Sequence, residues 1–123
     1  MATTSDFRVE TSRTERALIV TVSGDAGVSA SGKMETEFTR VLVQRPPVVI
    51  LDLSNMSFIS SLAMGLLVSL HRGISGWRGR LIVAGAHDRV TEALRRAQLD
   101  RVLVMKPTVE AALADLGNPV SAG

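Results

Sequence analysis

The sequence predicts an α/β fold with a mixed sheet of about five strands and about four helices. Short apolar, β-branched runs alternate with helical stretches after residue 31, which is the pattern of parallel strands joined by helices. Two strand-like runs come before residue 24 with no helix between them, so the sheet is expected to begin with an antiparallel hairpin. With 123 residues, of which 46% are hydrophobic, the chain is expected to form one domain over residues 1–123, with loose ends at 1–6 and 118–123.

The first hairpin is predicted from a change of pattern. Residues 7–12 alternate apolar and polar side chains, as a half-exposed strand does, and residues 17–23 form a more apolar run. The polar residues 13–16 supply the turn between them. The glycine-containing segment 24–27 is predicted to end the second strand.

The first helix is predicted from about Ser31, because four apolar residues recur at helical spacing and share one face. These are Met34, Phe38, Val41 and Leu42. The pair Pro46-Pro47 is expected to stop the helix.

The rest of the chain alternates strands and helices. Residues 48–53 are continuously apolar apart from Asp52, which is typical of a strand buried on both faces, and a loop is expected at 54–57. The further elements expected are a helix at 61–72, a strand at 81–86, a helix from Asp88, a strand at 101–105, and a last helix that begins near Pro107, is capped by Thr108 or a neighbour, and ends at Gly117.

Composition excludes several functional classes. There are no cysteines, so disulfides, thiolate metal sites and cysteine nucleophiles are ruled out. No apolar stretch reaches the roughly 20 residues that a membrane span needs, and the start lacks the pattern of a signal peptide, so a cytoplasmic protein without membrane insertion is expected. A formal net charge of +2 is too even to indicate binding to nucleic acid or to an anionic membrane.

Catalytic signatures are missing from the sequence. It contains no phosphate-binding GxxxxGK[ST] loop, no GxGxxG and no GxSxG. His71 and His87 stand apart, and Asp25, Asp52 and Asp88 are scattered over separate loops that are expected to reach one edge of the sheet, where caps or solvated residues are the simpler interpretation. We therefore expect no enzyme activity, no metal and no cofactor.

The informative segment is Leu51–Gly65, where a buried strand passes through a polar stretch into a helix whose start carries two serines. Asp52-Leu53-Ser54, followed by Phe58-Ile59-Ser60-Ser61-Leu62-Ala63-Met64, resembles the motif of the STAS domain family (sulphate transporter and anti-sigma factor antagonist), in particular its stand-alone bacterial anti-sigma factor antagonists. The order of elements and a late strand beginning Asp100-Arg101-Val102 extend the resemblance over nearly the whole chain.

The resemblance implies a mechanism of partner switching in sigma factor regulation. Family members bind an ATP-dependent serine kinase that is also an anti-sigma factor, and phosphorylation of a serine at the start of this helix abolishes that binding. By position the serine is Ser61, with Ser60 as the less favoured option. A serine phosphatase is a possible further partner. The partner-binding residues implied in this way are Asp25, Asn55, Ser60, Ser61, Leu62 and Met64.

The chemistry at Ser61 agrees with such a switch. Free N–H groups in a first helical turn attract an anion, and a phosphate adds about −1.5 to −2 charges without unfolding the helix. The sequence departs from the family pattern at Ser60, where many members have aspartate, and at Ala63, where glycine is usual. Serine still caps a helix but lacks the charge, and the alanine fills space near the helix start, where it is expected to hinder a kinase.

Three other interpretations stay open at this point. The residues alone favour Ser60 and Ser61 as a simple capping pair, and Ser60 with Ala63 motivates a constitutive scaffold or interaction subunit of a larger signalling or lipid-transport complex. A small nucleotide-dependent enzyme or DNA binder is a further class, against which the missing phosphate loops and the even charge argue. The group Arg89, Arg95, Arg96 and Arg101 is interpreted as a solvated helix face, with an acidic partner surface as the alternative.

Overall fold

The computed structural model describes residues 7–116. Its helices and strands follow one another in an order close to the predicted one. They are β1 (Arg8–Arg13), β2 (Leu18–Ala26), the 3₁₀ turn η1 (Val28–Ala30), α1 (Ser31–Gln44), β3 (Val48–Asp52), β4 (Met56–Ile59), α2 (Ser61–Ser75), β5 (Arg80–Ala84), α3 (Asp88–Arg96), the 3₁₀ turn η2 (Leu99–Arg101), β6 (Val104–Lys106) and α4 (Val109–Leu116).

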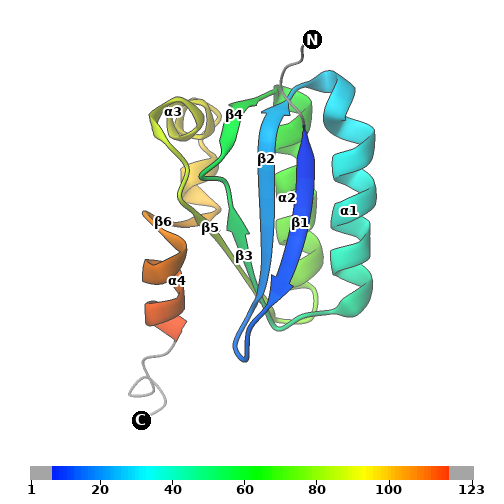
Figure 1. Ribbon diagram of the computed structural model, residues 1–123, viewed down its shortest axis with the longest axis vertical. Coiled ribbons are helices and arrows are strands. Elements are labelled where there is room, and N and C mark those ends of the chain that lie inside the picture. Colours follow the sequence, from blue (N-terminus) through cyan, green and yellow to red (C-terminus); the bar gives the residue numbers. More distant parts are fainter. Residues whose placement is uncertain (1–6, 117–123) are drawn as a thin grey trace.

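The sheet is mixed, as predicted. Its strands lie in the order β1-β2-β3-β5-β6, with the sixth strand, β4, paired to β2 outside this path (Figure 1). Only β1 and β2 are antiparallel within the described part of the chain, and the pairs β2–β3, β3–β5 and β5–β6 are parallel. The predicted hairpin followed by parallel strands is therefore confirmed.

The end of β2 and the strand β4 differ from the prediction. β2 runs on to Ala26 instead of stopping at the glycine, because Gly24 takes a left-handed backbone with φ of 90° that shifts the register. β2 pairs with β3 only as far as Thr21, and from Gly24 it pairs in parallel with β4. After the register shift Asp25 lies opposite Phe58 and Ala26 opposite Ile59. The segment expected to be a loop at 54–57 thus contains the start of a strand.

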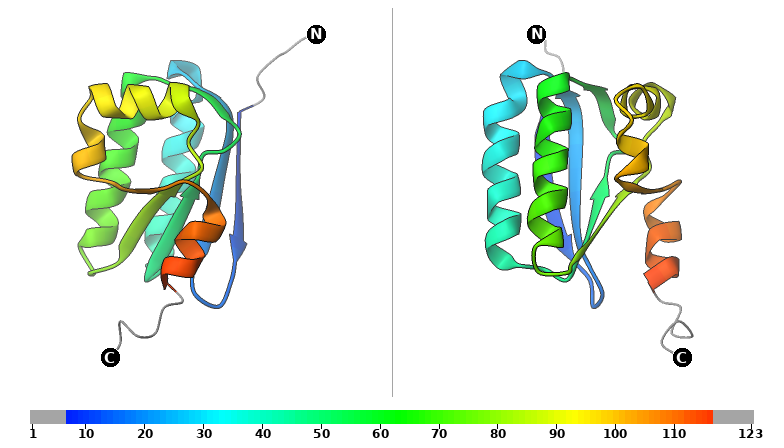
Figure 2. Two further views of the ribbon diagram at one scale, coloured as in Figure 1. Left: turned by 90° about the vertical axis from the view of Figure 1, so that its left-hand side faces the viewer. Right: turned by 180° about the vertical axis from the view of Figure 1, so that it is seen from behind.

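Two hydrophobic layers cover the two faces of the sheet. The larger contains Val20 and Val22 of β2, Leu51 of β3 and the inner residues of α1, α2 and α3. The smaller holds Ile50 and Ile82 against α4. Figure 2 shows α1 and α2 side by side on one side of the sheet and α4 on the other. Since neighbouring residues of β3 enter opposite layers and are fully buried, this strand is buried on both faces, as its sequence predicted.

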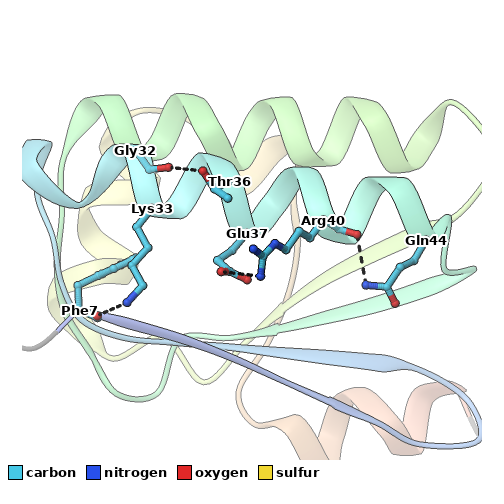
Figure 3. Close-up of polar contacts among 7 residues, drawn as sticks. All are labelled: Phe7, Gly32, Lys33, Thr36, Glu37, Arg40 and Gln44. Carbon is cyan, nitrogen blue, oxygen red and sulfur yellow. Dashed lines mark hydrogen bonds and ion pairs between the residues drawn. The ribbon is translucent and has the colours of Figure 1, made fainter.

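The predicted inner face of α1 is confirmed, with Met34, Phe38 and Val41 buried and Leu42 half-buried. The outer face is polar apart from the exposed Val43 and carries several local polar contacts (Figure 3). Thr36 donates to the carbonyl of Gly32 at 3.0 Å, Arg40 lies 3.5 Å from Glu37, and the Gln44 amide donates to the carbonyl of Arg40 at 3.2 Å. Lys33 reaches the carbonyl of Phe7 just before β1 at 3.5 Å, so it joins the helix to the sheet edge.

The later elements need three corrections. The strand predicted at 81–86 runs from Arg80 to Ala84, and Gly85 with φ of 78° follows its end. The strand predicted at 101–105 begins only at Val104, because Leu99 accepts backbone hydrogen bonds from Val102 and Leu103 and so closes a 3₁₀ turn. The second helix runs three residues further than expected, to Ser75.

The capping prediction for α4 is confirmed, since the Thr108 hydroxyl accepts a hydrogen bond from the Ala111 N–H at 3.0 Å. The expected helix end at Gly117 and the expected loose ends at 1–6 and 118–123 lie outside the described residues. In the part of the chain that is described, no helix combines the length and the apolar character needed to cross a bilayer.

Candidate functional site

The start of α2 is held in place by the ends of β2 and β4. The two strands run in parallel, so their carboxyl ends meet at one end of the molecule, where α2 begins (Figure 1). The Gly24 N–H donates to the carbonyl of Asn55 at 2.9 Å, and the Ser60 N–H donates to the carbonyl of Ala26 at 3.0 Å. Both hydrogen bonds bind the β2 end to the segment around β4, and together they fix where the helix starts.

Ser60 is the N-cap of α2. Its backbone is extended, with φ of −87° and ψ of 167°, and its hydroxyl oxygen accepts the Ala63 N–H at 3.1 Å. The side chain is half-buried. The hydroxyl of Ser60 therefore already performs the structural task of satisfying a free N–H of the first turn.

Ser61 is the first residue of α2, and it is exposed. Among residues 7–116, no hydrogen bond is formed by its hydroxyl or by the backbone N–H groups of Ser61 and Leu62. A phosphate on this oxygen would lie beside those two free donors, at the positive end of the helix dipole. The hydroxyl is accessible to another protein and is not required by the fold.

Exposed apolar side chains lie around this serine. Phe58 and Leu62 are each 49% exposed, and Val28, two residues beyond the end of β2 that pairs with β4, is 67% exposed. We call the set Val28, Phe58, Ser61 and Leu62 the Ser61 surface. Half of the large hydrophobic side chains that are exposed in the described chain belong to it, as the others are Val43, Val102 and Val104. Apolar residues gathered beside an accessible hydroxyl are typical of a surface that another protein covers.

The other expected partner-binding residues are placed differently. Asp25 is exposed and lies opposite Phe58, with its carboxylate close to Gly27, so it borders the Ser61 surface. Met64 is half-buried and packs against the core. Asn55 is exposed but precedes β4, whereas Ser61 follows it, so the whole strand separates the two.

Ala63 does not obstruct the Ser61 surface. It is fully buried in the larger hydrophobic layer, so its methyl group fills space under the helix start and faces away from any partner. Gly65, one turn after Ser61, is exposed, and an added Cβ there would meet no atom within 4 Å. The alanine therefore takes no space on the solvent side of the first turns, which removes the steric objection that it raised.

Val28 and Phe58 are additions to the residues predicted from sequence. Phe58 was recognised only as part of a motif, and its exposure depends on the burial pattern of β4, in which both middle residues are exposed. Val28 carries no sequence signal, because an apolar residue after a glycine-containing segment is equally consistent with a buried position.

The aspartates and histidines do not form a metal site. Among the described residues, no three histidine or acidic side chains come together in a way that would hold a metal ion. Asp52 accepts hydrogen bonds from the backbone and the hydroxyl of Ser54 at 3.0 and 2.7 Å, beside a cavity of about 280 Å³ between the ends of β3 and β5 and the start of α4. Asp88 instead opens α3.

His87 has a structural position that the sequence did not reveal. It is the N-cap of α3, where its Nδ1 accepts the Arg89 N–H at 3.2 Å. Its Nε2 lies 2.6 Å from the carbonyl of Met56, which requires the proton on Nε2. The ring thus joins α3 to β4, and through β4 it supports the position of the Ser61 surface.

Comparison with known proteins agrees with this fold. The model of the STAS domain family matches residues 8–112. No curated protein matches the chain in sequence.

Solved structures with the same fold include an anti-sigma factor antagonist from Mycobacterium paratuberculosis, with a TM-score of 0.85 at 19% identity, covering 94% of this chain and 98% of that one. The phosphorylated form of the Bacillus cell fate determinant SpoIIAA has a TM-score of 0.67 at 18% identity, covering 89% and 98% of the two chains. A sulfate transporter family protein from Wolinella succinogenes has a TM-score of 0.75 at 20% identity, covering 88% and 90%. Because the family match spans most of the chain and the observed sheet and helices agree with it, this protein belongs to the STAS domain family.

Proposed function

We propose that this protein is an anti-sigma factor antagonist that binds an anti-sigma factor with serine kinase activity, and that phosphorylation of Ser61 abolishes the binding. The observation that carries the proposal is an exposed hydroxyl at the first position of α2, surrounded by exposed apolar side chains. Similarity to SpoIIAA, a protein known in unphosphorylated and phosphorylated forms, supports the same assignment.

The proposed chemistry uses Ser61 as a substrate and places no catalytic step on this chain. The Ser61 oxygen attacks the γ-phosphorus of ATP bound to the kinase, the bond to the β,γ-bridging oxygen breaks, and ADP leaves while the hydroxyl proton passes to a base of the kinase. The product carries about −1.5 to −2 charges at neutral pH. A serine phosphatase would restore the hydroxyl by hydrolysis.

The switch depends on desolvation. A partner that covers Phe58 and Leu62 removes water from the neighbouring Ser61 oxygen, which is tolerable for a hydroxyl but costly for a dianion. The free N–H groups of Ser61 and Leu62 stabilise the phosphate in the unbound protein, so they favour dissociation further. Since Ser60 retains the cap, binding is lost without a change of fold.

The test combines modification mapping with binding. Phosphopeptide mass spectrometry of protein purified from the native host is expected to show one phosphate on Ser61. In pull-downs from the same cells, the unmodified protein and Ser61→Ala are expected to retain a serine kinase that Ser61→Asp does not retain. Ser69→Asp is the matched control, because Ser69 is also an exposed serine of α2 and lies two turns away. If Ser61→Asp retained the kinase as well as Ser69→Asp does, the proposed switch would be wrong.

A second candidate function keeps the interaction surface and omits the modification. In it the protein is a constitutive interaction subunit of a larger signalling or lipid-transport complex. The observation in its favour is the capping serine at position 60, where a charged aspartate is usual in antagonists. Partners without kinase activity, together with a Ser61 that is never modified in cells, would support this candidate over the first.

A further inference from the structure

The end of the molecule opposite Ser61 is rich in arginine. The strands β2, β3 and β5 begin side by side there, since Leu18 pairs with Val49 and Val48 pairs with Arg80 (Figure 1). The connections leading into all three strands carry exposed arginines. The five residues are Arg13, Arg16, Arg45, Arg78 and Arg80, and we call this region the arginine end.

The arginine end carries more positive than negative charge, since its five arginines stand beside two carboxylates, those of Glu15 between Arg13 and Arg16 and of Asp115. Within residues 7–116, only Arg80 of the five has a carboxylate within ion-pair distance, that of Asp115 at 3.5 Å. Arg13 donates to the side-chain oxygen of Gln44, and the Arg45 guanidinium lies 5.5 Å from the centre of the Trp77 ring. Neither interaction neutralises the positive charge of the arginine, because Gln44 and Trp77 are uncharged. The even balance of the whole chain therefore hides a local excess that the net charge of +2 does not reveal.

Two of these arginines occupy backbone positions that suit glycine better. Arg45 follows α1 with φ of 50°, and Arg78 follows α2 with φ of 64°. Left-handed backbone is unfavourable for a residue with a Cβ, and glycine or asparagine is the common choice after a helix. Stacking on Trp77 accounts for the side chain of Arg45, but no contact of this kind is found for Arg78 in the described structure. The backbone conformation at positions 45 and 78 therefore gives no reason for a long cationic side chain there.

The shape of the arginine end fits a broad surface better than a peptide. The arginines come from the ends of three separate connections, and only Arg13 and Arg16 of the five line the same hollow. The hollow between residues 13–18 and 46–48 holds about 150 Å³, well below the size of ordinary binding pockets. Val43, in the last turn of α1, is the most exposed large apolar side chain of the described chain at 77%, and it stands close to Arg45 in sequence. Arginines with an exposed apolar residue beside them are a combination suited to a lipid headgroup region. Trp77 is half-buried against the core, and its indole N–H donates to the carbonyl of Pro46 at 3.0 Å, so it supports this surface from beneath.

We propose that the arginine end binds peripherally to a membrane surface rich in anionic phospholipid headgroups. Clusters of four or more basic residues are attracted to such surfaces by charges that act roughly independently, and the planar guanidinium group matches the geometry of a phosphate. This contact would involve no insertion of a helix. It lies at the far end of the sheet from Ser61, so a partner on the Ser61 surface and a membrane on the arginine end can be bound at once.

The experiment measures sedimentation of the full chain with vesicles. Vesicles of phosphatidylglycerol and phosphatidylcholine in equal amounts are expected to bind the protein at low salt, and vesicles of phosphatidylcholine alone are not. The binding is expected to disappear at about 0.5 M NaCl, where charges are screened within a few ångströms. Trp77 is the single tryptophan of the chain and belongs to this end, so its fluorescence should shift to the blue with the anionic vesicles only.

Two triple variants provide the specificity test. Arg13→Gln/Arg16→Gln/Arg78→Gly removes three charges from the arginine end, and the glycine at position 78 suits the left-handed backbone, so the variant is expected to fold. Arg89→Gln/Arg96→Gln/Arg101→Gln removes three exposed arginines from α3 and η2. We expect the first to weaken vesicle binding by about a hundredfold and the second by less than about threefold.

Three outcomes would overturn the proposal. They are no binding of the native protein to the anionic vesicles, equal losses in the two variants, and binding to soluble poly-L-glutamate as tight as binding to the vesicles. The last would indicate an acidic protein segment as the occupant. Circular dichroism of each variant confirms that any loss is not caused by unfolding.

Discussion

Removal of the Ser60 hydroxyl tests whether Ser60 caps α2 while the Ser61 hydroxyl has no structural role. In Ser60→Ala the Ala63 N–H loses its 3.1 Å partner, while the hydrogen bond from the Ser60 N–H to Ala26 is unaffected because it uses the backbone. Loss of an N-cap serine costs about 1 kcal/mol. For a domain of this size, we expect the midpoint of thermal unfolding to fall by roughly 3–6 °C.

Ser60→Asp should behave differently. A carboxylate also accepts the Ala63 N–H, and its charge interacts favourably with the helix dipole by about 0.3–1 kcal/mol. The variant is therefore expected to be as stable as the native protein or slightly more stable, with the gain reduced at high salt.

Urea unfolding of the native protein and both variants measures these differences, with Ser69→Ala as the control. Ser69 is exposed within α2 and is not a cap, so replacement by the better helix former alanine should not destabilise the protein. If Ser60→Ala unfolded at the same urea concentration as the native protein, or if Ser60→Asp lost as much stability as Ser60→Ala, the capping argument would be refuted.

Three further predictions concern stability. Gly65→Ala should stabilise the protein by about 0.5–1 kcal/mol in urea unfolding, because the added Cβ in the exposed helix interior meets open space; a loss of stability would contradict this. Gly79→Ala should destabilise it by about 1–3 kcal/mol, since the new Cβ would lie 2.8 Å from a side-chain carbon of Ile74 and 3.1 Å from its carbonyl oxygen; a neutral result would show that the turn relaxes freely. His87→Ala should cost about 1 kcal/mol by uncapping α3, and His87→Asn should restore most of that loss in the same assay; equal losses would assign the effect to the contact with Met56.

The parts of the fold that sequence could predict are those with one strong physical cause. The inner face of α1 follows from apolar residues at helical spacing, and β3 follows from an apolar run too short for a helix. Thr108 was predictable as a cap because its hydroxyl acts within three residues. In each case the information is local.

Most of the missed features depend on distant partners, and the turn after Leu99 is the local exception. Gly24 carries the same sequence signal whether it ends a strand or bends one, and only pairing with β4 decides that β2 continues. The run Val102–Met105 is β-branched and strand-like, yet the carbonyl of Leu99 captures the N–H groups of its first two residues in a turn. The cap formed by His87 needs the carbonyl of Met56, which is 31 residues away. The arginine end was missed for the same reason, since its members come together only when three strands begin side by side.

The arrangement at α2 also indicates how the modification proposed for Ser61 would leave the helix start intact. A phosphate on a capping serine would take part in the cap itself, because its oxygens would accept the N–H groups that the hydroxyl serves. Here the cap and the proposed modification fall on neighbouring residues, and the extended backbone of Ser60 directs its hydroxyl to the Ala63 N–H while the next residue faces solvent. The strand β4 makes this possible, because its pairing with the end of β2 fixes the backbone immediately before the cap. A charge added at Ser61 therefore acts on whatever covers the surface and leaves the hydrogen bonds beneath it unchanged.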